Sequence, residues 1–403
     1  MRLAASSSGD MQPLRPFIRG SLTSAAFAAL TIAAITGCGD ASTSSAHPAG
    51  EGGGGGGSVG GTTSGGAPAA GSAGSSGLAG NSGQAPTVAP DLPPRPDGGP
   101  GDGASANVQA VKEFELPLDP IEVFQRAYSV DGLKFSNADD PSHCKLQPEG
   151  KKKDVVIDGP NGQDNSFGKN VLPVLLALSP SLEKEINLAI STGDNTLLIR
   201  VDALGNGKQY SPLVSEIFPA AGQRDASGAP VAPANWQSYA WEPLSDFVTN
   251  ATAEGDALRS KTKLADGYLV EDTWVSGTRS TIPLHLSLGG QRTPLTVRAA
   301  VLVHKYAADR ATAESGVISG VLDTNEFLLA FKGVVGKVSS SLCDGATLDK
   351  VLERLRAASD IMADGTQSTA TCDGISIALG YRTERAVIGP AGVAKPQPPA
   401  CGP

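Results

Sequence analysis

One polar stretch of the chain has the residue types and the spacing of a cation site. From Asp158 to Ser166 it reads Asp-Gly-Pro-Asn-Gly-Gln-Asp-Asn-Ser, so oxygen-bearing side chains alternate with glycines that let the backbone wrap. Ca²⁺ takes roughly six to eight oxygen ligands, and the candidates here are Asp158, Asn161, Asp164 and Asn165. The stretch departs from the EF-hand loop, because its acidic positions are out of register and no glutamate closes it. The alternative interpretation is a structured turn that caps the following helix.

All tryptophans of the chain lie in one interval, at Trp236, Trp241 and Trp274, together with Tyr239 and Tyr268. Exposed rings on a β-rich domain can stack on sugar rings, so the three tryptophans are candidate ligand-stacking residues. Aromatic side chains are more often buried or half-buried in a core. Binding to a glycan that is lost in Trp241→Ala would distinguish the two interpretations.

The sequence offers little support for catalysis, and no catalytic residue is assigned. His143, His285 and His304 belong to no HExxH motif and to no cysteine–histidine set. Glu271 and Asp272 are adjacent, and neighbours in a strand point to opposite faces, which argues against a shared acid–base pair. Hydrolysis by carboxylates scattered along the sequence stays open as the alternative.

The elements that must position these residues are mostly strands. Strands are expected at 154–157, 196–201, 213–218, 268–270, 273–275, 282–288, 295–303, 316–322 and 374–381. Helices are expected at 171–178, with Pro173 in the first turn, at 179–190 before Gly193, from Asp323 as a cap to 338, and at 347–361. The pattern predicts a β-rich α+β fold, an antiparallel sandwich-like domain with a few packed helices.

Four cysteines follow the N-terminal third of the chain, at Cys144, Cys343, Cys372 and Cys401. An even number in an exported domain indicates two disulfides, and the absence of a C-x-x-C pair weakens a metal site. Three pairings are possible. We expect Cys343–Cys372 as the local pair and Cys144–Cys401 as a clasp between the start and the end of the domain.

The N-terminus has the layout of a secretory signal. Arginines precede an apolar core at 22–35, which is shorter than the roughly 20 residues that a membrane span needs. The core ends at Ile35-Thr36-Gly37-Cys38, and this stretch resembles the lipobox of bacterial lipoproteins. The resemblance covers only the leader and this cysteine.

The lipobox resemblance implies that the chain is cut before Cys38 and that this residue receives several acyl chains, palmitate among them. Several chains anchor a protein stably where one does not. In the enterobacterial sorting pattern, Gly39 directly after the cysteine favours the outer membrane. The predicted location is therefore the cell envelope, in the outer membrane, with the domain facing the periplasm or the surface.

Composition divides the chain into three parts. Residues 1–37 are the expected signal peptide, and 38–106 are the lipidated cysteine with a Gly/Ser/Pro-rich tether that buries too little apolar surface to fold. Residues 107–403 are the expected β-rich ectodomain.

The charge balance narrows the class of partner. The net charge is −9 and no basic stripe is present, which excludes nucleic acid as the predicted partner. The predicted partners are the membrane, through the lipid, and a glycan or an envelope protein. The sequence favours a binding or surface-structural module with no cofactor beyond a structural Ca²⁺, and the alternative is an extracytoplasmic hydrolase that acts on glycans.

Overall fold

The computed structural model describes residues 91–119, 123–133, 142–148, 158–159, 162–225, 227, 229, 231, 234–236, 238–394, 396–397 and 400–401. The strands are β1 (Asn107–Glu115), β2 (Thr196–Val201), β3 (Gln209–Arg224), β4 (Ala240–Pro243), β5 (Thr262–Val270), β6 (Thr273–Val275), β7 (Ser280–Leu288), β8 (Gln291–Tyr306), β9 (Thr312–Asp323), β10 (Gly374–Arg385) and β11 (Val387–Ile388). The helices are α1 (Leu172–Leu178), α2 (Leu182–Ser191), α3 (Thr324–Val338) and α4 (Gly345–Arg356). A π-helical segment (Phe167–Val171) leads into α1. Within these ranges, no helix has both the length and the hydropathy to cross a membrane.

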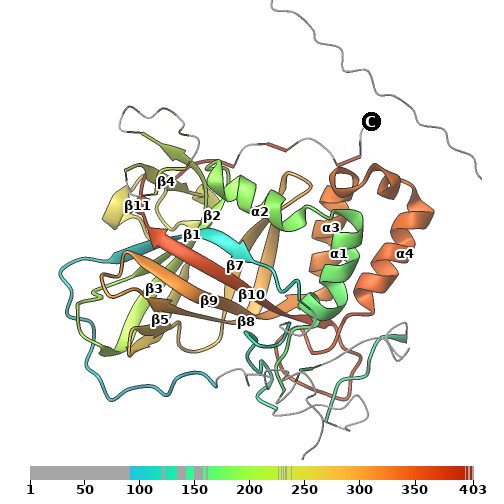
Figure 1. The fold of residues 1–403 in the computed structure, drawn as a ribbon, viewed down its shortest axis with the longest axis horizontal. Coiled ribbons are helices and arrows are strands. Elements are labelled where there is room, and N and C mark those ends of the chain that lie inside the picture. The colour runs from blue at the N-terminus through green and yellow to red at the C-terminus, as the bar shows by residue number, and fades with distance from the viewer. Residues whose placement is uncertain are drawn as a thin grey trace, which may run out of the picture. The chain divides into compact units, whose positions relative to one another are not determined.

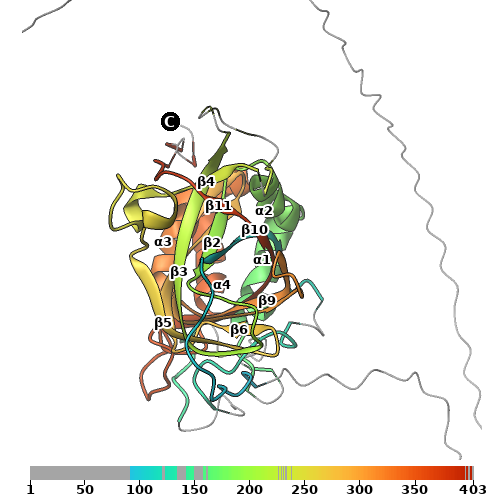
Figure 2. The same cartoon turned by 90° about the vertical axis from the view of Figure 1, so that its left-hand side faces the viewer.

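The strands form an antiparallel sheet that closes on itself. Neighbours pair in the order β1, β2, β3, β5, β6, β8, β9 and β10, and β10 pairs again with β1. Strand β7 extends the sheet beside the first part of β8, and β4 extends it beside the last part of β3. Figure 2 views the closed sheet almost end-on, and Figure 1 shows α1, α3 and α4 gathered beside one end. The expected β-rich α+β fold with a few packed helices is confirmed, and its sandwich-like core lies between opposite walls of one sheet.

The main core lies inside the closed sheet because successive side chains of a strand point to opposite faces. Ile199 of β2 stands opposite Ile217 of β3, and both are fully buried in the main core. The preceding residue, Leu198, belongs to a separate cluster with Trp241 of β4. Strand β2 is thus covered on both faces, which explains why its sequence is apolar almost throughout.

Helix α3 covers one end of the sheet and starts at the residue that the sequence indicates. The Asp323 carboxylate accepts hydrogen bonds from the backbone N–H groups of Asn325 (2.9 Å) and Glu326 (3.0 Å). These bonds satisfy two of the donors that a helix start leaves free. Phe327 and Phe331 then bury one face of the helix in the main core.

Most expected elements are confirmed, but strands β1, β4 and β11 were not predicted and one helix is shorter than expected. Strand β1 was not predicted, because a register shift between Val111 and Glu113 interrupts its alternation of apolar and polar residues. Helix α4 ends at Arg356, several residues earlier than expected. The strand expected at 154–157 lies outside the described residues.

Two disulfides form, but the expected pairing of the cysteines was wrong. Cys144 bonds to Cys372 and Cys343 bonds to Cys401, with Cα–Cα distances of 5.1 Å and 5.7 Å. Helix α4 and the following loop carry Cys372 away from Cys343 to the start of β10, where its N–H donates to the Lys145 carbonyl (2.8 Å). Proximity in the sequence therefore misled the prediction, because the fold decides which cysteines meet.

The folded unit begins earlier than residue 107, where we expected the tether to end. The Arg95 guanidinium lies 4.9 Å from the ring centre of Tyr268, and its Nη1 donates to the Ser211 hydroxyl (3.1 Å). The Tyr268 hydroxyl donates to the Pro93 carbonyl (2.6 Å). The segment 91–106 therefore belongs with β3 and β5, and single side chains rather than an apolar pattern attach it.

Candidate functional site

Three aspartates gather where the calcium hypothesis placed two of its ligands. Asp158 and Asp164 flank a tight turn in which Gly159 N donates to the Gln163 carbonyl (2.8 Å). Asp360 comes from the loop that follows α4. Oxygen atoms of the three carboxyl groups lie within 4.8 Å of one another, with Asp164 and Asp360 buried and Asp158 half-buried. We call these three residues the acidic cluster.

Burial favours the protonated form of each carboxyl group in the acidic cluster. Burial, and then the charge of Asp360, raises the pKa of Asp158 to about 8. Burial also raises the pKa values of Asp164 and Asp360 well above their ordinary range. Asp158 and Asp164 share a side-chain hydrogen bond, which needs a proton on one of them. Asp360 accepts hydrogen bonds from the N–H (2.8 Å) and the hydroxyl (2.5 Å) of Ser376.

The acidic cluster fits a hard divalent cation in part. Such a cation takes carboxylate oxygens and would replace the protons that burial otherwise retains. Three carboxylates supply three to six oxygens, which is at most the lower end of what Ca²⁺ takes. The calcium site thus stays a prediction, with Asp360 as a ligand that the sequence did not indicate.

Asn165 lies outside the acidic cluster, which corrects one predicted ligand. Its Oδ1 accepts hydrogen bonds from the N–H groups of Ala378 (2.9 Å) and Gly168 (3.0 Å). Both lone-pair directions of this oxygen are therefore used. The bond to Gly168 caps the helical segment that leads into α1, as the turn-cap alternative predicts. Asn161 lies outside the described residues.

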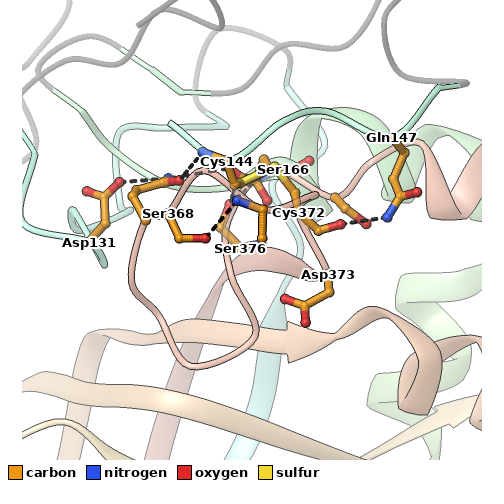
Figure 3. The surroundings of a disulfide bond; sticks show 12 residues. Asp131, Cys144, Gln147, Ser166, Ser368, Cys372, Asp373 and Ser376 are labelled. Carbon is orange, nitrogen blue, oxygen red and sulfur yellow. Dashed lines mark hydrogen bonds between the residues drawn. A yellow bond between two sulfur atoms is a disulfide. The ribbon is translucent and has the colours of Figure 1, made fainter. Parts of the chain in front are cut away.

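Gln367 connects the first disulfide, whose surroundings Figure 3 shows, to the loop that carries Asp360, because its Nε2 also donates to the Asp360 carbonyl (3.5 Å). Gln367 Oε1 accepts from the Cys144 N–H (2.9 Å), and Gln367 Nε2 donates to the carboxylate of Asp131 (3.0 Å). The charge of Asp131 contributes to the raised pKa of Asp158, after burial and the charge of Asp360. The Cys144–Cys372 bond therefore supports the loops that hold these carboxyl groups close together.

Trp241 and Trp274 do not form an exposed stacking surface, which corrects their assignment as ligand-stacking residues, while a glycan partner stays a prediction. Trp241 and Trp274 are fully buried, and Trp236 is half-buried with its ring 5.3 Å from that of Trp241. Trp274 lies against the His304 ring at 4.8 Å. A sugar ring cannot stack on a buried face, so these residues act as core side chains.

The histidines are buried as well. His304 Nδ1 lies 2.9 Å from the Tyr381 hydroxyl inside the sheet, and burial lowers the pKa of His304 to about 3. Burial, and then the charge of Arg292, lowers the pKa of His285 to about 4. Neither imidazole gains a proton near neutral pH, so neither suits general acid–base work there.

A cavity of about 450 Å³ lies at the end of the closed sheet away from α3. Strand β9 runs from this end, at Thr312, to the start of α3, at Asp323. The cavity is bordered by the start of β1, the β2–β3 and β4–β5 connections, the β8–β9 turn, the end of β10 and β11. Its polar lining includes Asn107, Asn206, Asp256, Asp309, Arg310 and Arg385. We call it the open-end cavity.

The sequence did not indicate Asp360, Arg310 or Arg385, because their partners lie far away along the chain. Asp360 lies within the helix that the sequence predicts at 347–361. Comparison of this chain with protein-family models, with curated proteins and with solved structures found no match. The site therefore has to be interpreted from its own geometry.

Proposed function

We propose that this protein is a lipid-anchored lipoprotein of the cell envelope whose ectodomain is a binding module for a small polar ligand. The observation that carries the binding function is the open-end cavity of about 450 Å³. Its size lies within the range of small-molecule sites, and the mouth of a closed sheet is a common place for them. Its polar side chains come from five separate parts of the chain, so they can converge on one ligand.

The pairing of the other cysteines is consistent with a lipid anchor at Cys38. The disulfides use all four cysteines that follow Cys38, so no cysteine of the sequence is left to pair with it. Two disulfides also agree with an oxidising compartment outside the cytoplasm. Both observations support the lipobox interpretation of Ile35-Thr36-Gly37-Cys38.

The anchor is tested by membrane fractionation of a Cys38→Ser variant. The parent protein should label with radioactive palmitate and sediment with membranes. The variant should lose the label and keep its leader. A variant that is cut normally and stays in the membrane fraction would remove the lipoprotein proposal.

The pKa values of the acidic cluster favour binding over the alternative of glycan hydrolysis. Paired-carboxylate hydrolysis needs one protonated acid and one ionised partner. The pKa values of Asp158, Asp164 and Asp360 are all raised, and Asp360 is tied to Ser376. All three pKa values shift in the same direction, so the cluster shows no contrast between a protonated acid and an ionised base.

The binding function is tested by filling the open-end cavity. Ser105 is exposed and lines the cavity, so a Ser105→Trp side chain can occupy it without entering the core. The full-length parent, purified from its membrane, should carry a small molecule that mass spectrometry detects after denaturation. That molecule should be absent from Ser105→Trp and present in Thr347→Trp, a matched exposed site on α4. Equal recovery from both variants would show that the cavity is not the binding site.

A further inference from the structure

We propose that the open-end cavity binds an oxyanion, a carboxylate or a phosphate group, through the guanidinium groups of Arg310 and Arg385. This inference rests on the proposed binding function and names its ligand class. It is carried by a buried arginine for which the described part of the chain provides no acidic partner.

Arg310 is buried without a counter-charge. Only 6% of its surface is exposed, and its Nη2 donates to the Gly207 carbonyl. Its Nη1 is covered and has no hydrogen-bond partner, and no ion pair joins Arg310 to a carboxylate of the described residues. A buried charge without a partner is costly, and buried polar groups in proteins are generally satisfied. A bound anion would provide the partner that the protein does not supply.

The backbone of Arg310 adopts a strained conformation. Its φ of +54° lies in the left-handed region, which residues other than glycine, asparagine and aspartate seldom adopt. Its carbonyl accepts hydrogen bonds from the side chains of Gln109 (2.9 Å) and Asn107 (3.2 Å). Strained positions of this kind persist where surrounding contacts enforce them and are concentrated at ligand sites. The β8–β9 turn therefore presents an arginine where glycine would be easier to accommodate.

Arg385 brings a second guanidinium to the same cavity. It stands opposite Gln109 across the β1–β10 pair, and its Nη2 donates to the Asp309 carbonyl (3.1 Å). Like Arg310, it has no ion-pair partner among the described residues. Two arginines from different strand ends thus meet at the β8–β9 turn.

Two acidic side chains also border the cavity, Asp256 and Asp309. Both are exposed, and the Asp309 carboxylate accepts the Ala311 N–H (2.9 Å). Water screens charges at exposed positions much more than at buried ones. The buried guanidinium of Arg310 therefore has more influence on a ligand inside the cavity than the two rim carboxylates.

The lining further restricts the ligand. A guanidinium presents N–H groups in a planar fork that matches the oxygens of a carboxylate or a phosphate. Val108, Leu204 and Ile388 supply apolar wall beside the arginines. The ligand class is a compact molecule with one oxyanion group and a small apolar body.

The test is calorimetric titration of the full-length protein in detergent with inorganic phosphate and, separately, with acetate. Chloride at equal ionic strength serves as the reference. The parent should bind at least one anion saturably. Arg385→Gln, at an exposed position, should weaken binding about tenfold, since a charged hydrogen bond contributes about 1.5 kcal/mol. Arg310→Lys keeps the charge without the fork and should weaken binding to a similar extent.

Arg354→Gln on α4 is the matched control, because it removes one exposed arginine outside the cavity. It should bind like the parent. Binding of phosphate alone indicates a phosphorylated ligand, and binding of acetate alone indicates a carboxylate. Saturation by neither anion, or equal affinity in the Arg310 and Arg385 variants, would overturn the inference.

The titration also separates this inference from the binding function. If Ser105→Trp loses a co-purifying molecule that has no oxyanion, the cavity binds a ligand and only the arginine inference fails. If Ser105→Trp loses nothing and neither anion binds, both proposals fail together.

Discussion

The sulfur atoms of Cys144 and Cys372 are bonded across 228 residues of chain. Backbone hydrogen bonds accompany the disulfide, from Lys145 N to the Ala370 carbonyl (2.7 Å) and from Cys372 N to the Lys145 carbonyl (2.8 Å). The bond is thus one part of a packed junction that lies beside the acidic cluster and keeps its loops in place.

Removing this disulfide should destabilise the fold more than removing the other. A cross-link that closes a longer loop takes more entropy from the unfolded chain. The loops span 228 and 58 residues, which corresponds to about 5 and about 4 kcal/mol for the two bonds. Urea unfolding of Cys144→Ser/Cys372→Ser and of Cys343→Ser/Cys401→Ser measures both losses. A larger loss for the second pair would contradict the prediction.

Asp158→Asn should make the free energy of unfolding less dependent on pH. The pKa of Asp158 is raised to about 8, so its protonated form stabilises the fold fully below about pH 4. That contribution is lost as the pH rises towards 8, and the loss is at most about 6 kcal/mol, because one pKa unit corresponds to about 1.4 kcal/mol. The asparagine amide can still donate to Asp164, so the variant should match the parent at pH 5.

The difference should appear at high pH, in unfolding measurements between pH 5 and pH 9. There Asp158→Asn should be more stable than the parent. Asp349→Asn removes an exposed carboxylate on α4 and is the control, with the pH dependence of the parent. A parent whose stability is flat from pH 5 to pH 9 would argue against the buried protons.

Calcium at the acidic cluster, predicted from the sequence, should raise the melting temperature. The ion must displace protons from the carboxyl groups, so the rise should be larger at pH 8.5 than at pH 6. Asp360→Asn should lose the effect, while Asp349→Asn should keep it. Differential scanning calorimetry with millimolar Ca²⁺ and with EGTA measures the shift, and equal melts in both would end the calcium hypothesis.

Trp241→Ala should lower the stability of the fold. Trp241 belongs to β4 and its ring is fully buried, and deleting a buried tryptophan costs about 3–5 kcal/mol. Trp236→Ala, at the half-buried neighbour, should cost less. Chemical denaturation measures the difference in the free energy of unfolding. An equal or smaller loss for Trp241→Ala would show that its ring contributes no more to the core than its half-buried neighbour.

Local patterns identified much of the fold from the sequence. The Asp323 cap, the apolar face of α2 and strand β2 depend on neighbours within a few residues, and each is found where it was expected. Strand β1 was not predicted, because a register shift interrupts its alternation of apolar and polar residues. The attachment of residues 91–106 to the sheet was not predicted, because single side chains such as Arg95 form it and no apolar pattern marks it.

By itself the sequence determined the β-rich class, most element positions, two of the three clustered aspartates and the even set of cysteines. These follow from spacing along the chain, through periodicity, turn residues and capping. Only the tertiary structure decided that the sheet closes, which cysteines pair, that Asp360 joins Asp158 and Asp164, and that Arg310 and Arg385 share a cavity. Those contacts join residues separated by tens to hundreds of positions, and no local preference records which distant segments will pack together.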